Sequence, residues 1–142
     1  MEESIKAAFG LEEQDYRSFS ALTLAYIGDC IFDLVIRTVV IYKSKKQVND
    51  LHKKATRFVK AETQAVMVQG LLDNDMLTEE EKAVYKRGRN AKSHTSAKNA
   101  SIGAYRKATG FEAVLGYLYV TGQMERVLEL TKAGITFTGM EL

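Results

Sequence analysis

The 142-residue sequence contains no proline, and its β-branched residues are not arranged in short alternating runs. Proline interrupts helices, whereas alternation of apolar and polar residues is the main signature of a half-buried strand. Both observations favour helices throughout, and we predict an all-α fold. A chain of this length is expected to form one domain, residues 1–142, with enough side chains to bury a hydrophobic core.

Apolar periodicity and helix-end signals define five expected helices. The first begins near Ser18 or Ser20, and the second follows Asn49 as its N-cap. Thr78 and Glu81 have the spacing of a capping box, which marks the start of the third helix. The aperiodic segment between the third and fourth helices is expected to form a loop. The expected ranges are about 18–42, 50–72, 79–88, 99–120 with room for a break near residue 110, and 123–133.

Composition excludes two broad classes of protein. With 46% apolar and 27% charged residues, the chain is neither disordered nor embedded in a membrane, and it has no apolar run of membrane-spanning length. The amino terminus, Met1-Glu-Glu-Ser, is acidic, and no apolar stretch follows it as in a secretory signal. The single cysteine, Cys30, cannot form an internal disulfide. We therefore expect a cytoplasmic protein.

The net charge of +2 conceals a strongly basic segment. From Lys82 to Phe111 the chain has no Asp or Glu but eight of its 20 basic residues, which leaves twelve basic residues elsewhere against all 18 acidic ones. Clustered cations bind nucleic-acid phosphates because binding releases counterions. Charge alone allows an equally simple interpretation, a solvated basic loop without a partner.

Two acidic residues interrupt apolar helix faces. Asp29 is expected on the buried face of the first helix, and Glu112 on a buried face of the fourth. Burying an ionised carboxylate without a partner costs several kcal/mol, so each acid needs a cation or hydrogen-bond donors. The two faces are Leu22, Ala25, Tyr26, Asp29, Phe32 and Ile36, and Ala108, Glu112, Leu115 and Tyr119.

Two explanations are open for these acids. Each could pair separately with a buried basic side chain, a tyrosine or a backbone donor. Alternatively, one divalent cation could satisfy both, since Mg²⁺ prefers oxygen ligands and often binds one or two carboxylates together with substrate phosphates. Such an ion could activate water and stabilise charge on a phosphodiester. Gly28 and Gly116, beside the two acids, indicate close helix packing or close approach of a substrate.

The segments around these acids resemble the ribonuclease III catalytic domain. Tyr26-Ile-Gly-Asp-Cys-Ile-Phe is similar to the family's Phe-Leu-Gly-Asp motif, and Phe111-Glu-Ala-Val-Leu-Gly-Tyr-Leu-Tyr is similar to its second motif. The resemblance extends over about residues 16–130. It is strongest to Mini-ribonuclease III, the short form without a double-stranded-RNA-binding domain, of which Arg87-Gly-Arg-Asn-Ala-Lys92 and Tyr105-Arg-Lys-Ala-Thr-Gly-Phe-Glu-Ala are typical.

The resemblance implies a helical bundle of the ribonuclease III type that assembles as a homodimer and cleaves double-stranded RNA. Asp29 and Glu112 match two of the four acidic metal ligands of ordinary ribonuclease III, and the other two positions hold Ala25 and Thr109. Mini-ribonuclease III has the same reduced set. We accordingly expect Asp29 and Glu112 to be both catalytic residues and ligands of Mg²⁺, for which Mn²⁺ could substitute.

The resemblance also implies a substrate and partners. The expected substrate is the 23S ribosomal RNA precursor, with a ribosomal protein as a candidate helper and no membrane partner. Without an appended RNA-binding domain, the catalytic domain must hold the duplex itself, through phosphate and 2′-hydroxyl contacts. The expected RNA-binding residues are Arg87, Arg89, Asn90, Lys92 and Lys98, with Ser93 and Thr95 as neutral donors and Lys53 and Lys54 as weaker candidates.

Two other functions remain compatible with the residues. The reduced acidic set would also suit a non-catalytic module that binds structured RNA or associates with the ribosome. A helical protein-interaction module would require the basic segment to be incidental. If the protein binds an RNA duplex tightly but does not cut it in the presence of Mg²⁺, the non-catalytic module is favoured over an enzyme. If RNA affinity is unchanged after replacement of Arg87, Arg89 and Lys92, the protein-interaction module is favoured.

Overall fold

A computed structural model describes residues 1–45, 47–92 and 101–142, and every regular element in these ranges is helical. The all-α prediction is therefore confirmed. After a short first helix and a 3-10 turn, the long second helix leads into the bundle. The elements are α1 (Glu2–Phe9), η1 (Tyr16–Ser18), α2 (Ala21–Lys43), α3 (Val48–Val59), α4 (Ala61–Asp73), α5 (Glu79–Asn90), α6 (Ile102–Val120) and α7 (Met124–Thr136).

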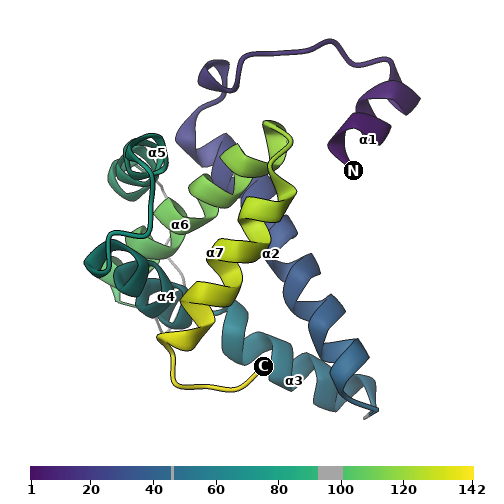
Figure 1. Cartoon of the computed structure of the whole chain (residues 1–142), viewed down its shortest axis with the longest axis vertical. Coiled ribbons are helices and arrows are strands. Elements are labelled where there is room, and N and C mark those ends of the chain that lie inside the picture. The colour runs from purple at the N-terminus through teal and green to yellow at the C-terminus, as the bar shows by residue number, and fades with distance from the viewer. Residues whose placement is uncertain (46, 93–100) are drawn as a thin grey trace.

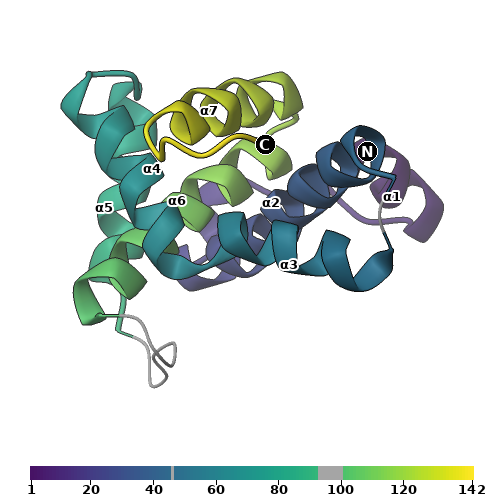
Figure 2. The same ribbon diagram turned by 90° about the horizontal axis from the view of Figure 1, so that it is seen from below.

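Helix α6 forms the centre of the bundle. It packs against α2, α4, α5 and α7, and Figures 1 and 2 show it surrounded by these helices. Between Ala108 and Tyr119 every residue of α6 is buried except Glu112, which is partly buried and is the one charged residue of that run. A helix that is apolar on all sides belongs in a core. Glu112 is thus held at the middle of the best-packed element.

Several predicted helix ends are confirmed. Ser20 caps α2 by accepting a hydrogen bond from the Thr23 amide at 3.1 Å. Thr78 and Glu81 form the reciprocal capping box at the start of α5. Gly122 adopts a φ of 74° between α6 and α7, a conformation that glycine tolerates without the strain of a Cβ.

The helix expected to follow Asn49 is instead two helices, α3 and α4, that meet at Lys60. Helix α3 already begins at Val48, after Gln47, and Lys60 has an extended backbone with a ψ of 152°. Side chains replace the helical hydrogen bonds that are missing at this corner, because the Thr63 hydroxyl donates to the Arg57 carbonyl at 2.6 Å. Such side-chain bonds, rather than glycine or proline, allow the chain to turn.

Two glycines expected to weaken helices are contact points instead. Helix α5 continues through Gly88 to Asn90, so Arg89 and Asn90 are helical and not in a loop, and α6 is unbroken at Gly110. A Cβ on Gly88 would lie 2.8 Å from the Gly110 Cα, which shows that the two helices cross here in close contact.

Helix α1 was not expected from the sequence, and none of its residues is buried.

An ion pair links α5 to α7. Both oxygens of the Glu81 carboxylate, which is 3% exposed, accept hydrogen bonds of 2.9 Å from Arg126, and Arg126 also donates to the Met76 carbonyl. Burial by itself would raise the pKa of Glu81, but these bonds and the Thr78 amide outweigh it and hold the pKa below its usual value. The same pairing raises the pKa of Arg126.

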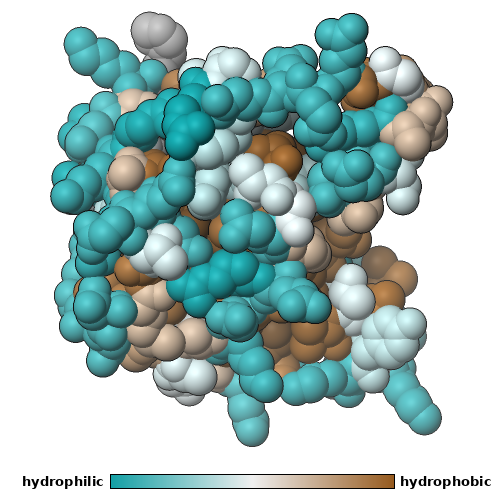
Figure 3. All heavy atoms as spheres, turned by 45° about the horizontal axis from the view of Figure 1, so that its top comes forward, coloured by the Kyte–Doolittle hydropathy of each residue, from teal (hydrophilic) through white to brown (hydrophobic). Residues whose placement is uncertain are grey.

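The surface is uneven in hydropathy. In Figure 3 the largest apolar area lies at the lower right, whereas the left side is mainly hydrophilic. No helix within the described ranges is both long and apolar enough to span a membrane. Large exposed apolar residues of α2 and of the segment before it include Ile5, Phe9, Leu11, Tyr26, Leu34, Ile41 and Tyr42.

Candidate active site

The site is positioned by a glycine contact between α2 and α6. A Cβ placed on Gly28 would overlap the backbone carbonyl of Glu112, and one placed on Gly116 would overlap the carbonyl of Leu24. The two helix backbones therefore touch. The expectation of close packing at these glycines is confirmed, and its consequence is that Asp29, next to Gly28, is brought beside Glu112.

The predicted burial of Asp29 is wrong. Asp29 is exposed, and two members of its expected apolar face, Leu22 and Tyr26, are 38% and 81% exposed. The reason is that α6 covers only part of the apolar face expected from the sequence, the part where Ala25 and Phe32 are buried. Leu22, Tyr26 and Asp29 lie at the open edge of the contact and border a cavity instead of the core.

Glu112 has a strongly perturbed carboxylate. Burial raises its pKa most, and the charge of Asp29 and a hydrogen-bonding contact with Asp29 raise it further, from 4.5 to about 8. A hydrogen bond of 3.1 Å from Gln64 Nε2 acts in the opposite direction. The pair is therefore unfavourable as two bare anions, and either a proton or a cation relieves it.

Both carboxylates line one cavity of about 520 Å³. Ala25 and Thr109, which the sequence resemblance matches to acidic positions of ordinary ribonuclease III, line it as well. The structure thus brings together all four positions of the motif-based comparison, two of them without charge. The remaining lining residues are Leu22, Tyr26, Val59, Ala61, Gln64, Tyr105 and Ala108.

The donor set is compatible with a divalent cation that keeps much of its hydration. In the described part of the chain, no group of three or more His, Cys, Asp or Glu side chains could hold a metal. Mg²⁺ retains several waters and commonly binds protein through one or two carboxylates. Asp29 and Glu112 meet that requirement, and the raised pKa of Glu112 is the effect that a bound cation would offset.

None of the expected RNA-binding residues in the described ranges lines this cavity. Arg87, Arg89 and Asn90 are exposed on the last turn of α5, with Lys92 just beyond it. Arg87 donates to the Phe19 carbonyl at 3.3 Å, and Arg89 lies 5.8 Å from the Tyr85 ring centroid. These side chains are thus exposed at the end of α5 and are separate from the lining of the cavity.

Other basic residues differ in whether their charge is already paired. Lys82 forms ion pairs with Asp75 and Glu79, at 2.7 and 3.3 Å. On α3, Lys53 is exposed and Lys54 is half-buried. The remaining RNA-binding candidates, Lys98, Ser93 and Thr95, lie outside the described residues.

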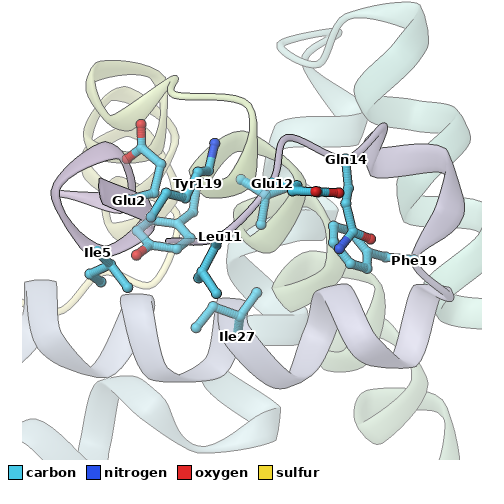
Figure 4. Close-up of a pocket in the computed structure, with 10 residues that line it drawn as sticks. Glu2, Ile5, Leu11, Glu12, Gln14, Phe19, Ile27 and Tyr119 are labelled. Atoms are coloured by element: carbon cyan, nitrogen blue, oxygen red, sulfur yellow. The ribbon is translucent and has the colours of Figure 1, made fainter. Parts of the chain in front are cut away.

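A second hollow, of about 370 Å³, lies where the N-terminal segment crosses α2 and α6. Its walls are largely apolar, and Figure 4 shows its two carboxylates, Glu2 and Glu12, well apart with Leu11 between them. It brings no pair of acids together as the cavity of Asp29 and Glu112 does.

Gln64 and Tyr105 were missed by sequence reasoning, although both line the site. Gln64 could have been found by the reasoning used for Glu112, because it is a polar residue on the buried face of an apolar helix. Its neighbours Ala65, Met67 and Val68 are buried, and Gln64 itself is 1% exposed. Tyr105 precedes the apolar run of α6 and gave no comparable signal.

Comparison with known proteins agrees with this geometry. The family model described as the Ribonuclease III domain matches residues 22–123, a range that includes both carboxylates and both contact glycines. The chain is 50% identical over 117 residues to Mini-ribonuclease 3 of Enterococcus faecalis, which covers 82% of this chain and 89% of that protein. It is 51% identical over 121 residues to Mini-ribonuclease 3 of Clostridium tetani, covering 84% and 79% respectively.

The fold is also similar to a solved structure. A crystal structure of a protein from Fusobacterium nucleatum matches with a TM-score of 0.77 and 28% sequence identity. The match covers 87% of this chain and 97% of that protein.

Proposed function

Because this chain belongs to the ribonuclease III domain family, in its Mini-ribonuclease 3 branch, it is an endoribonuclease of double-stranded RNA, and we propose that Asp29 and Glu112 are its catalytic, metal-binding carboxylates. The observation that carries the proposal is the electrostatic pairing of these two acids in one cavity. We further propose 23S ribosomal RNA precursor as the substrate and Mg²⁺ as the ion, with Mn²⁺ as a substitute.

In this mechanism the protein provides a fixed pair of oxygen ligands. Asp29 and Glu112 would hold the cation, which when bound supplies an activated water and stabilises charge developing on the phosphodiester. The backbone contact at Gly28 keeps the two helix segments that carry these carboxylates close together. Ala25 and Thr109 add no charge, so water and phosphate oxygens complete the coordination of the ion.

The basic surface on α5 would hold the duplex. Arg87, Arg89, Asn90 and Lys92 are exposed and lie together at the end of that helix. Duplex RNA is recognised mainly by shape and through its phosphates, for which such side chains are suited. By sequence we assign Lys98 to the same role, with Lys53 and Lys54 as secondary candidates.

The apolar surface of α2 supports a homodimer. Tyr26 is 81% exposed, and Leu34 and Ile41 are exposed further along the same helix. Exposed apolar patches of this kind mark protein interfaces. Since Tyr26 also lines the cavity, a second copy bound here would lie next to the active site.

Digestion of a perfect RNA duplex with and without Mg²⁺ tests the proposal. The protein should cut only with the metal, and Asp29→Asn and Glu112→Gln should each abolish cleavage while folding and RNA binding persist. Retained cleavage by either variant would remove these residues from the chemistry. Tight, salt-sensitive binding without any cleavage by the unmodified protein would instead favour the non-catalytic RNA-binding module.

A further inference from the structure

Gln64 connects the end of α3 to the carboxylate on α6. Its Nε2 donates one hydrogen bond to the Val59 carbonyl at 2.8 Å and another to Glu112 Oε2 at 3.1 Å. The side chain is 1% exposed, so neither bond competes with bulk water. Glu112 is thereby tied to a backbone atom through a single amide group.

The orientation of this amide is determined by its partners. Both groups facing Nε2 are acceptors, and a reversed amide would place Oε1 against two oxygens. The cost of the observed orientation is that Oε1 is buried and accepts no hydrogen bond from any described residue. An unpaired buried polar atom is unfavourable, and an apolar side chain of similar length would avoid it. The sequence nevertheless places glutamine among apolar neighbours, which points to a role beyond packing.

We propose that Gln64 is a positioning residue, which fixes the Glu112 carboxylate in one orientation toward the cation that it shares with Asp29. The inference rests on the proposed function, since it needs a metal at this pair. Residues that hydrogen-bond to metal ligands orient them, and their loss typically weakens metal affinity about 10- to 100-fold. The Val59 carbonyl gives the amide a rigid anchor, so Glu112 cannot swing freely between orientations.

The test measures Mn²⁺ binding to the protein alone, by electron paramagnetic resonance, for the wild type, Gln64→Met and Gln64→Asn. The methionine removes the donor at similar length, and the asparagine keeps an amide that is too short to join Val59 to Glu112. Each should raise the Mn²⁺ dissociation constant about 10- to 100-fold. The Mn²⁺ concentration needed for half-maximal cleavage should shift by the same factor.

Thr63→Val is the matched control. Thr63 is also buried at the same corner and also donates to a carbonyl of α3, that of Arg57, but it does not contact Glu112. Its replacement should lower the unfolding temperature and leave Mn²⁺ affinity within about twofold, because it removes a comparable bond that does not involve the carboxylate. Equal Mn²⁺ affinity in wild type and in whichever Gln64 variants fold would overturn the proposal.

Asp29→Asn separates failure of the positioning role from failure of the metal site. Wild-type binding that is lost in Asp29→Asn but unchanged in the Gln64 variants rejects the positioning role alone. Absence of any Asp29-dependent Mn²⁺ binding in the wild type rejects the metal site, and the role of Gln64 with it.

Discussion

Gly28 and Gly116 face each other across the contact between α2 and α6, and neither position has room for a Cβ. Because each glycine has only a hydrogen in place of a Cβ, this contact sets how closely the backbones that carry Asp29 and Glu112 approach each other. The geometry of the active site therefore depends on this helix contact. A substitution that disrupts the contact should reduce both stability and cleavage.

Gly28→Ala should separate the two helices. Because the added methyl group would overlap the Glu112 carbonyl, we expect a loss of about 3 kcal/mol in the free energy of unfolding, at the upper end for an overpacked core, and loss of cleavage. Gly103→Ala, at a helical position on α6 that faces open space, should slightly stabilise the protein and keep activity. Urea unfolding and duplex cleavage measure both. Full activity in Gly28→Ala would show that the close contact is not needed.

The pH dependence of stability should reveal the perturbed pKa of Glu112. A carboxyl whose folded-state pKa is raised stabilises the protein fully below its ordinary pKa of 4.5, and this contribution is lost as pH rises toward about 8. In metal-free buffer, wild type should thus lose more stability than Glu112→Gln between pH 5 and pH 8, by about 1.4 kcal/mol for each unit of pKa shift that is realised.

Exposed Glu125→Gln is the control for this measurement and should keep the wild-type dependence. Added Mg²⁺ should restore wild-type stability at pH 8, because a cation replaces the proton, and should have little effect on Glu112→Gln. Identical pH profiles for wild type and Glu112→Gln would contradict the raised pKa.

The ion pair of Glu81 and Arg126 predicts the opposite dependence of stability on pH from that of Glu112. The pKa of Glu81 is lowered, so its contribution is present above its ordinary pKa and is lost as pH falls through the folded-state value. Arg126→Met should cost about 3 kcal/mol at neutral pH, since it leaves a buried carboxylate unpaired. Lys82→Met, which breaks exposed ion pairs with Asp75 and Glu79, should cost less than about 1 kcal/mol. Thermal unfolding from pH 3 to pH 7 compares the two.

The basic residues of α5 predict a salt dependence of RNA binding. Replacing Arg87, Arg89 and Lys92 by Gln should reduce the slope of log affinity against log salt concentration by roughly 2 to 3, about one for each phosphate that the variant no longer neutralises. The measurement uses an Asp29→Asn background to prevent cleavage. Lys82→Gln should leave the slope unchanged, because Lys82 is already paired with acids. An unaffected triple variant would indicate that the duplex lies elsewhere.

The exposed face of α2 predicts an effect on assembly. Tyr26→Asp should convert the expected dimer to a monomer in light scattering, because it places a charge in an apolar interface. Leu128→Asp, at an exposed apolar position on α7, should remain dimeric. A dimeric Tyr26→Asp protein would place the interface on another surface.

The helical architecture and most helix ends could be predicted because they depend on local chemistry, as at Ser20 and in the Thr78 and Glu81 capping box. The corner at Lys60 could not, because its compensating bonds come from Thr63 and Gln64 side chains that also occur inside ordinary helices. The exposure of Asp29 was missed for a related reason. Periodicity shows which face of a helix is apolar, but not how much of that face a neighbouring helix covers.

Glu112 is carried by the helix against which α2, α4, α5 and α7 all pack. Local fluctuations that open loops or fray helix ends cannot reach such a residue, so its backbone amide should exchange with solvent only when the whole domain unfolds. The backbone that carries Glu112 should therefore stay in place through any local opening of the structure, whereas Asp29 is exposed at the edge of the same contact.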